Sequence, residues 1–150
     1  MSTTVQYATF YLDQEYLGVD VLRVQEVLRK QVMTPIPQSP DDIAGLINLR
    51  GQIVTAIDLR RRLGMPCLEP DRDSMNVIVR GDEGPISLLV DDIGDVVEVP
   101  ADSLEPRPET MSSSAASFLR GIHKLPNTLL GVLDVDRLSR GGEETGREGR

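Results

Sequence analysis

The chain has 150 residues, enough for one domain or for two small domains packed closely together. Sixteen basic and 24 acidic residues give a net charge of -8, which repels phosphate backbones and anionic lipid headgroups. Nucleic-acid binding and direct membrane binding are therefore not expected. A single cysteine and a single histidine exclude a disulfide framework and almost every zinc site, so we expect no cofactor. No apolar run reaches the roughly 18 residues of a membrane span, and we expect a cytoplasmic protein.

Short apolar runs separated by glycine, proline and polar residues predict an all-β fold. Residues 5–12 alternate polar and apolar side chains with the period of two that a strand requires. A polar turn at 13–15 and a second apolar run to Val21 complete a predicted hairpin. Further predicted strands, rich in Val, Ile and Leu, cover residues 46–49, 52–57, 75–80, 86–90, 95–99, 118–122 and 128–133. Many short strands of this kind are typical of a sandwich or a barrel.

Helical signals are few and short. Asp20 can cap a turn in which Val24, Val27 and Leu28 follow helical spacing. Asp58 can cap a second short helix, which a glycine and a proline then end. The sequence therefore predicts an all-β fold with short helices.

An internal repeat is the most informative feature of the sequence. Each half has a Val-Asp pair, then a Leu-Arg-Gly triplet, then a hydrophobic-Asp pair. A hydrophobic-x-acid-Val element also recurs in each half. The matches are Val19-Asp20 with Val90-Asp91, Leu49-Arg50-Gly51 with Leu119-Arg120-Gly121, Ile57-Asp58 with Leu133-Asp134, and Val24-Gln25-Glu26-Val27 with Ile93-Gly94-Asp95-Val96.

The repeat divides the chain into two β subdomains of about 70 residues. Units of this size rarely build a strong core alone, so we expect the two to pack together and share one hydrophobic core. Their halves are expected to meet near the polar stretch 69–76, within a domain at 1–138. Residues 139–150 contain no aliphatic side chain and predict a disordered tail.

A small β-barrel hydrolase is the alternative from another functional class. Its nucleophile would be Ser117 or one of the serines at 112–114, with His123 as base and Asp134 as orienting group. No nucleophile-elbow context surrounds these serines, and His123 is interpreted as a polar hairpin residue beside Lys124. We therefore expect no catalytic residue and no enzyme.

Other charged or reactive side chains have ordinary structural interpretations. The basic run at 60–62 is expected to be the solvated face of a short helix. The carboxylates at 91, 92 and 95 are expected to be solvated or to cap turns, because they lack the spacing of a calcium loop. Cys67 is expected to be a passive, partly buried thiol, and no metal site is predicted.

The Asn-Leu-Arg-Gly segment at 48–51 is different, because it interrupts two apolar strands. Gly51 suits a tight turn, which would hold Arg50 on a rigid edge. A rigidly placed guanidinium offers a planar fork of donors to a carboxylate, either in this chain or in a partner. We predict that Glu26 pairs with Arg50. This pair would order the turn, take part in binding, or do both.

These residues resemble the CheW family, the coupling proteins of bacterial chemotaxis, over positions 5 to about 138. The Asn-Leu-Arg-Gly turn followed by Ile57-Asp58-Leu59-Arg60 is the specific signature. Other matching stretches occur in the family's order. They are Phe10-x-Leu12, Gly18-Val19-Asp20, Val24-x-Glu26-Val27, Thr34-Pro35-Ile36-Pro37, Pro40-x-x-Ile43-x-Gly45, Leu88-Leu89-Val90-Asp91, Val96-Val97-Glu98-Val99 and Leu119-x-Gly121.

The resemblance implies two SH3-like five-stranded β barrels with a hydrophobic core between them, and a function without catalysis. Such a protein links the cytoplasmic tips of chemoreceptors to the regulatory domain of the histidine kinase CheA. It would be associated with membrane receptor arrays through these partners. The kinase-facing residues implied are Glu26, Gly45, Arg50 and Gly51, and the receptor-facing residues are Val24, Val27 and Val96.

Two further interpretations remain open within the class of non-catalytic proteins. One is a scaffold for a non-flagellar chemosensory pathway, such as pilus motility or a second-messenger cascade. The other is a structural module in which the pair of Arg50 and Glu26 stabilises the turn and nothing more.

Overall fold

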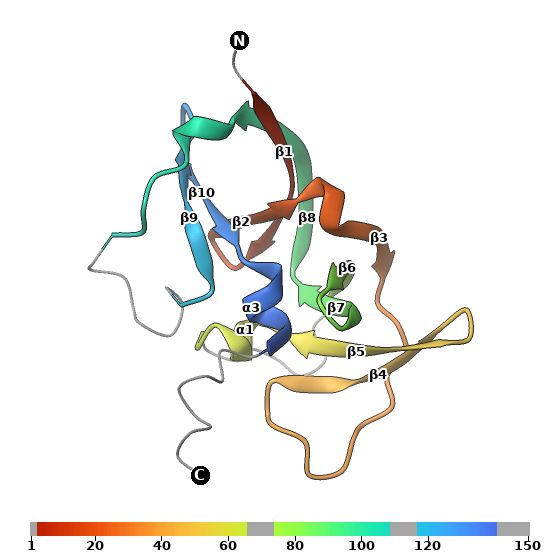
Figure 1. Ribbon diagram of the computed structural model, residues 1–150. Helices are drawn as coiled ribbons and strands as arrows, with labels where there is room; N and C mark the ends of the chain where they lie inside the picture. The colour runs from red at the N-terminus through yellow and green to blue at the C-terminus, as the bar shows by residue number, and fades with distance from the viewer. Residues whose placement is uncertain (1–2, 66–73, 109–116, 141–150) are drawn as a thin grey trace.

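The computed structural model describes residues 3–65, 74–108 and 117–140. Within these ranges, strands alternate with short helices along the chain (Figure 1). The strands before residue 66 are β1 (Thr4–Leu12), β2 (Glu15–Asp20), β3 (Val24–Arg29), β4 (Ile43–Leu49) and β5 (Gln52–Asp58). Those after residue 73 are β6 (Met75–Gly81), β7 (Gly84–Val90), β8 (Asp92–Pro100), β9 (Leu119–Lys124) and β10 (Leu129–Leu133). The helices are η1 (Val21–Arg23), α1 (Leu59–Arg62), η2 (Ala101–Ser103) and α3 (Val135–Arg140).

The strands form two five-stranded sheets, which confirms the predicted fold class. Sheet 1 has the order β8-β1-β2-β10-β9, and sheet 2 has the order β3-β6-β7-β5-β4. Each sheet is bent towards closure by one further bridge. Thr34, beyond β3, pairs with Leu46 of β4, and Glu105, beyond β8, pairs with Ile122 of β9. The two sheets occupy different parts of the molecule, with α3 between them (Figure 1).

The two sheets exchange strands between the halves of the chain. The hairpin β1–β2 from the first half pairs with β8, β9 and β10 from the second half. The hairpin β6–β7 from the second half pairs in the same way with β3, β4 and β5 from the first. The predicted junction near 69–76 therefore separates two sequence repeats but not the two subdomains, which is a correction. The exchange is reciprocal, so the two sheets have the same topology, with each strand of one repeat equivalent to a strand of the other.

The strand register shows which positions of the two repeats are equivalent. Leu12 pairs with Glu15 to close the first hairpin, and Gly81 pairs with Gly84 to close the second. Counting back from these turns aligns β1 with β6, which are the partners of β8 and β3. Val24 and Val27 pair with Val79 and Val77, and Ile93 and Val96 pair with the equivalent residues Phe10 and Ala8. The predicted match of Val24-Gln25-Glu26-Val27 with Ile93-Gly94-Asp95-Val96 is confirmed, and both elements contain a β-bulge.

Two other repeat matches were assigned in the wrong register. Gly121 lies within β9, where a Cβ would be 2.6 Å from the Glu105 carbonyl oxygen. Gly45 has the same environment in β4, with the Thr34 carbonyl oxygen 2.8 Å from its Cβ position. Gly121 is therefore equivalent to Gly45 and not to Gly51. β2 pairs in parallel with β10, and β7 pairs in the same way with β5. By this register, the true equivalent of Val19-Asp20 begins two residues before the predicted match, Val90-Asp91.

Three clusters of buried side chains stabilise the fold. The largest is contributed by both sheets, α1 and α3, and confirms the predicted shared core. Its members include Phe10, Leu12, Leu59, Val77, Leu88 and Leu138. Each sheet also encloses a smaller cluster on its other face. Ile47, Val54 and Ile78 belong to that of sheet 2, and Tyr7, Leu130 and Val132 to that of sheet 1.

The predicted elements agree with the structure except at two places. Asp20 caps only the three-residue η1, and Val24 to Arg29 form strand β3 instead of a helical turn. Pairing with β6 decides this, because β-branched valines pack well on a sheet. Residues 139 and 140 belong to α3 and not to a tail. Residues 69–73 and 141–150 lie outside the described residues. No helix among the described residues is long and apolar enough to cross a membrane.

Candidate functional site

The turn between β4 and β5 holds Arg50 in a defined position. Leu49 pairs with Gln52, so the connection has two residues, Arg50 and Gly51. Both have positive φ angles, 52° for Arg50 and 87° for Gly51, which is the pattern of a type I′ hairpin turn. The Gly51 amide donates a hydrogen bond of 2.9 Å to the Asn48 side-chain oxygen. Each residue of the Asn-Leu-Arg-Gly segment thus has a local role in the turn.

Arg50 forms the predicted ion pair with Glu26 of β3. The Arg50 side chain is 67% exposed and that of Glu26 is 23% exposed. An ion pair with so much exposure contributes about 0–1 kcal/mol to stability. The guanidinium therefore remains accessible to a partner while Glu26 restrains its direction.

Gly45 does not belong to the surface of this turn. It is buried in β4 at the bulge opposite Ile57 and Ala56, with φ of 155°. A Cβ at this position would meet the Thr34 carbonyl oxygen at 2.8 Å. Gly45 thus admits the close approach of residues 33–34, and offers no side chain for contact.

The three valines expected to face a receptor lie on edge strands, on one face of each sheet. The bulge in β3 places Val24 and Val27 on the same face, the face of Val79 and Val77 in the shared core. Val96 of β8 pairs with Ala8, which packs against that core as well. Val27 is 40% exposed and Val96 is 55% exposed, so the apolar face of the shared core continues outward along both edges.

One further member of this face, Ile93, was not predicted from the sequence. Ile93 is the equivalent of Val24, and both pack against the shared core from the edge strands. The signal was present, because the repeat aligns Ile93 with Val24 in the hydrophobic-x-acid-Val element.

Two of the three arginines of α1, Arg60 and Arg62, are not on a solvated face, which corrects the prediction, whereas Arg61 is exposed as expected. Arg60 and Arg62 are only 6% and 9% exposed. The Arg60 guanidinium donates to the Asp13 carboxylate at 2.8 and 2.6 Å and to Asp91 at 3.2 Å through Nε. Arg62 Nε donates to Asp42 at 2.6 Å. Asp91 is therefore a partner of a buried cation and not a solvated carboxylate.

His123 lies in the β9–β10 hairpin, as predicted, and is fully buried there. Its Nε2 lies 3.1 Å from the Tyr7 hydroxyl and its Nδ1 lies 2.8 Å from the Ser103 hydroxyl. Burial lowers the pKa of the imidazole. Asp134 caps α3 by accepting from the Arg137 amide at 3.1 Å. The structure thus does not favour the hydrolase alternative. Serines 112–114 and Cys67 lie outside the described residues.

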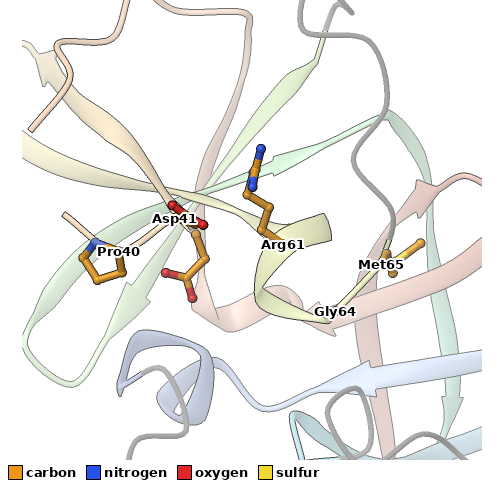
Figure 2. Close-up of a pocket in the computed structure, with 6 residues that line it drawn as sticks. Pro40, Asp41, Arg61, Gly64 and Met65 are labelled. Carbon is orange, nitrogen blue, oxygen red and sulfur yellow. The ribbon is translucent and has the colours of Figure 1, made fainter. Parts of the chain in front are cut away.

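The described part of the chain also contains a hollow of about 550 Å³ beside α1 (Figure 2). Arg61 lines it from the side of the helix, and Pro40 and Asp41, in the loop before β4, line it from the other side. None of the seven predicted site residues lines it. The lining residues are Pro40, Asp41, Asp42, Arg61, Gly64 and Met65. No group of three or more His, Cys, Asp or Glu side chains within the described ranges is arranged to hold a metal ion.

Comparison with known proteins connects this geometry to a family. The model of the CheW-like domain matches residues 6–143. The chemotaxis protein CheW of Klebsiella aerogenes is 31% identical over 133 residues, which cover 89% of this chain and 80% of that protein. CheW of Rhizobium meliloti is 30% identical, with coverage of 83% and 79%. The crystal structure of the scaffolding protein TtCheW from Thermoanaerobacter tengcongensis superimposes with a TM-score of 0.82 at 31% identity, over 91% of this chain and 92% of that chain. This chain therefore belongs to the CheW family of chemotaxis adaptor proteins.

Proposed function

We propose that this protein is a non-catalytic adaptor that couples chemoreceptor tips to the regulatory domain of the histidine kinase CheA. The observation that carries the proposal is the type I′ turn that presents Arg50. An exposed cation on a rigid turn, directed by Glu26, suits recognition of a carboxylate on a partner protein. Arg50, Gly51 and Glu26 would form the kinase-facing surface, with Gly45 as its buried support.

The receptor-facing surface would be the apolar face of the two edge strands. Val24, Val27 and Val96 suit the apolar ridge of a helical hairpin, which is the shape expected for a receptor tip. Among the described strands β3 and β8 lie at the edges of their sheets, and Val27 and Val96 are exposed on them. In this proposal the protein acts in the cytoplasm and reaches the membrane only through its receptors.

Two narrower alternatives use the same geometry. A scaffold of a pilus-motility or second-messenger pathway would bind a different kinase and different receptors through equivalent surfaces. A structural module would use the pair of Arg50 and Glu26 for stability alone. The exposure of the Arg50 side chain, 67%, supports a binding role over a purely stabilising one.

Arg50→Asn is the variant that tests the kinase-facing surface. Asparagine is favoured at the first central position of a type I′ turn, so the turn is kept while the guanidinium is removed. The variant loses a charge-assisted hydrogen bond at the contact. Its affinity for the CheA regulatory domain of the same organism, measured by calorimetry, is therefore expected to be at least about tenfold weaker than that of the wild type. Lys124→Gln is the matched control, because it removes another exposed cation, 71% exposed and paired with Glu105, from the opposite sheet.

The thermal stability of both variants is measured with their affinities. Weaker binding of Arg50→Asn alone, at wild-type stability, supports the kinase-facing role. Equal affinities for all three proteins contradict the role of Arg50. A wild-type protein that is folded but does not bind this kinase contradicts coupling to CheA and leaves the other chemosensory pathway as the better proposal.

A further inference from the structure

The two edge strands present equivalent rows of side chains on the face of the shared core. Val24 and Ile93 are equivalent and partly buried, and Val27 and Val96 are equivalent and exposed. The correspondence between the two sheets is reciprocal, as it is for a twofold rotation, so it also exchanges these two apolar rows. Because the rows are equivalent, apolar contact alone gives a partner two nearly equal orientations.

The next residue on the same face of each strand differs in charge. Arg29 of β3 pairs with Met75, and Glu98 of β8 pairs with Gln6. They follow Val27 and Val96 by two residues, so they share the face of these valines and are equivalent to each other. Both are exposed. The apolar row on β3 is therefore followed by a basic residue, and the equivalent row on β8 is followed by an acidic one.

Not every pair of equivalent residues on the two strands differs in charge. Elsewhere on the two strands, the equivalent residues Glu26 and Asp95 carry the same charge. Glu98 accepts a hydrogen bond of 2.7 Å from the Thr4 hydroxyl, which leaves its charge in place. Among the described residues, Arg29 has no ion pair. Neither charge is neutralised within the described part of the fold.

We infer that Arg29 and Glu98 fix the orientation in which the receptor tip binds. The inference rests on the proposed function and adds to it the charge pattern of the partner. Two antiparallel helices of a tip also have an approximate twofold axis, so their apolar ridge fits the valine rows in either orientation. The partner is expected to carry an acidic side chain where it meets β3 and a basic one where it meets β8.

Charge reversal tests this inference, because the variant with both Arg29→Glu and Glu98→Arg presents the wild-type pattern turned by half a turn. The probe is a soluble cytoplasmic signalling fragment of a cognate receptor. Each single reversal places two like charges on the surface and is expected to weaken binding about three- to tenfold at low salt. The double variant is expected to bind within about threefold of the wild type. Glu83→Arg, in the exposed turn between β6 and β7, is the control for a change in net charge.

The orientation of the bound receptor tip is determined with a photo-crosslinking residue at position 32, which is 91% exposed and close in sequence to Arg29. The wild type is expected to capture one helix of the tip, and the double variant the other helix. Unchanged affinities of the single variants overturn the inference, and so does a double variant with the wild-type crosslinks. A wild-type protein that does not bind the receptor fragment overturns the receptor-facing role itself and the inference with it.

Discussion

Arg60 joins three segments of the fold, and its removal is expected to be among the most destabilising single changes. It extends from α1 to Asp13, in the turn between β1 and β2, and to Asp91, directly after β7. These residues belong to both sheets, so the cation fixes the relative position of the two subdomains. The side chains of Arg60 and Asp91 are 8% and 11% exposed, whereas that of Asp13 is 39% exposed.

The expected loss in the free energy of unfolding follows from the two carboxylates that Arg60→Ala would leave without their cation. Removing one partner of a buried ion pair costs about 3–5 kcal/mol, because the remaining charge stays buried without its counter-ion. Asp91 would keep the hydrogen bond of 2.6 Å that it accepts from the Asp13 amide. Solvent screens part of the repulsion at Asp13, so we expect about 3 kcal/mol. A domain is typically stable by about 5–15 kcal/mol, so this is a substantial part of the total.

Urea unfolding followed by circular dichroism measures the effect. With a slope of about 2 kcal/mol/M, the midpoint should fall by about 1.5 M. The neighbouring Arg61 is the control: its side chain is 43% exposed and pairs with Asp58 at 3.5 Å, so Arg61→Ala should cost less than about 1 kcal/mol. Replacing Asp91 by Asn in the Arg60→Ala background should recover part of the loss. A loss below about 1 kcal/mol for Arg60→Ala would refute the reasoning.

Two further predictions concern pH and close backbone contact. Burial lowers the folded-state pKa of His123 below the ordinary 6.5, so the unfolded state binds more protons in acid and stability falls as pH falls through 6.5 towards the folded-state pKa. His123→Gln should flatten this slope, which is at most about 1.4 kcal/mol per pH unit, in urea titrations between pH 5 and 7.5; an unchanged slope would contradict the assignment. Gly45→Ala and Gly121→Ala should each cost about 1–3 kcal/mol by thermal unfolding, because their Cβ atoms would lie 2.8 and 2.6 Å from carbonyl oxygens. A Cβ at Gly51 would have open space, so Gly51→Ala should reduce stability only through the strain of its positive φ, by about 1–2 kcal/mol. A larger loss of stability at Gly51 than at Gly121 would contradict this reasoning.

Local patterns in the sequence were sufficient for much of the fold and for the turn of the candidate site. The alternation at 5–12 predicts β1, and Asp58 predicts the cap of α1, because each depends on neighbours within a few residues. The pair of Arg50 and Glu26 was also predictable, since a two-residue turn has few directions in which to hold its first side chain.

Contacts between distant segments explain what the sequence did not predict. Arg60 looks like part of a basic helix face, because its partners lie 47 and 31 residues away. His123 is next to a lysine in the sequence, but its hydrogen-bond partners come from β1 and η2. The exchange of hairpins between the repeats was not predictable either, because a repeat defines equivalent segments without defining which copy they pair with.

One edge strand contributes to both proposed binding surfaces. β3 carries Val24 and Val27 on the face of the shared core, while Glu26 between them reaches the turn that presents Arg50. A substitution in β3 that weakens binding therefore does not identify which partner is lost, because a shift of the strand moves both surfaces. Arg50 and Val96 lie on different sheets, and each belongs to only one proposed surface. These two residues are the positions at which kinase binding and receptor binding can be separated.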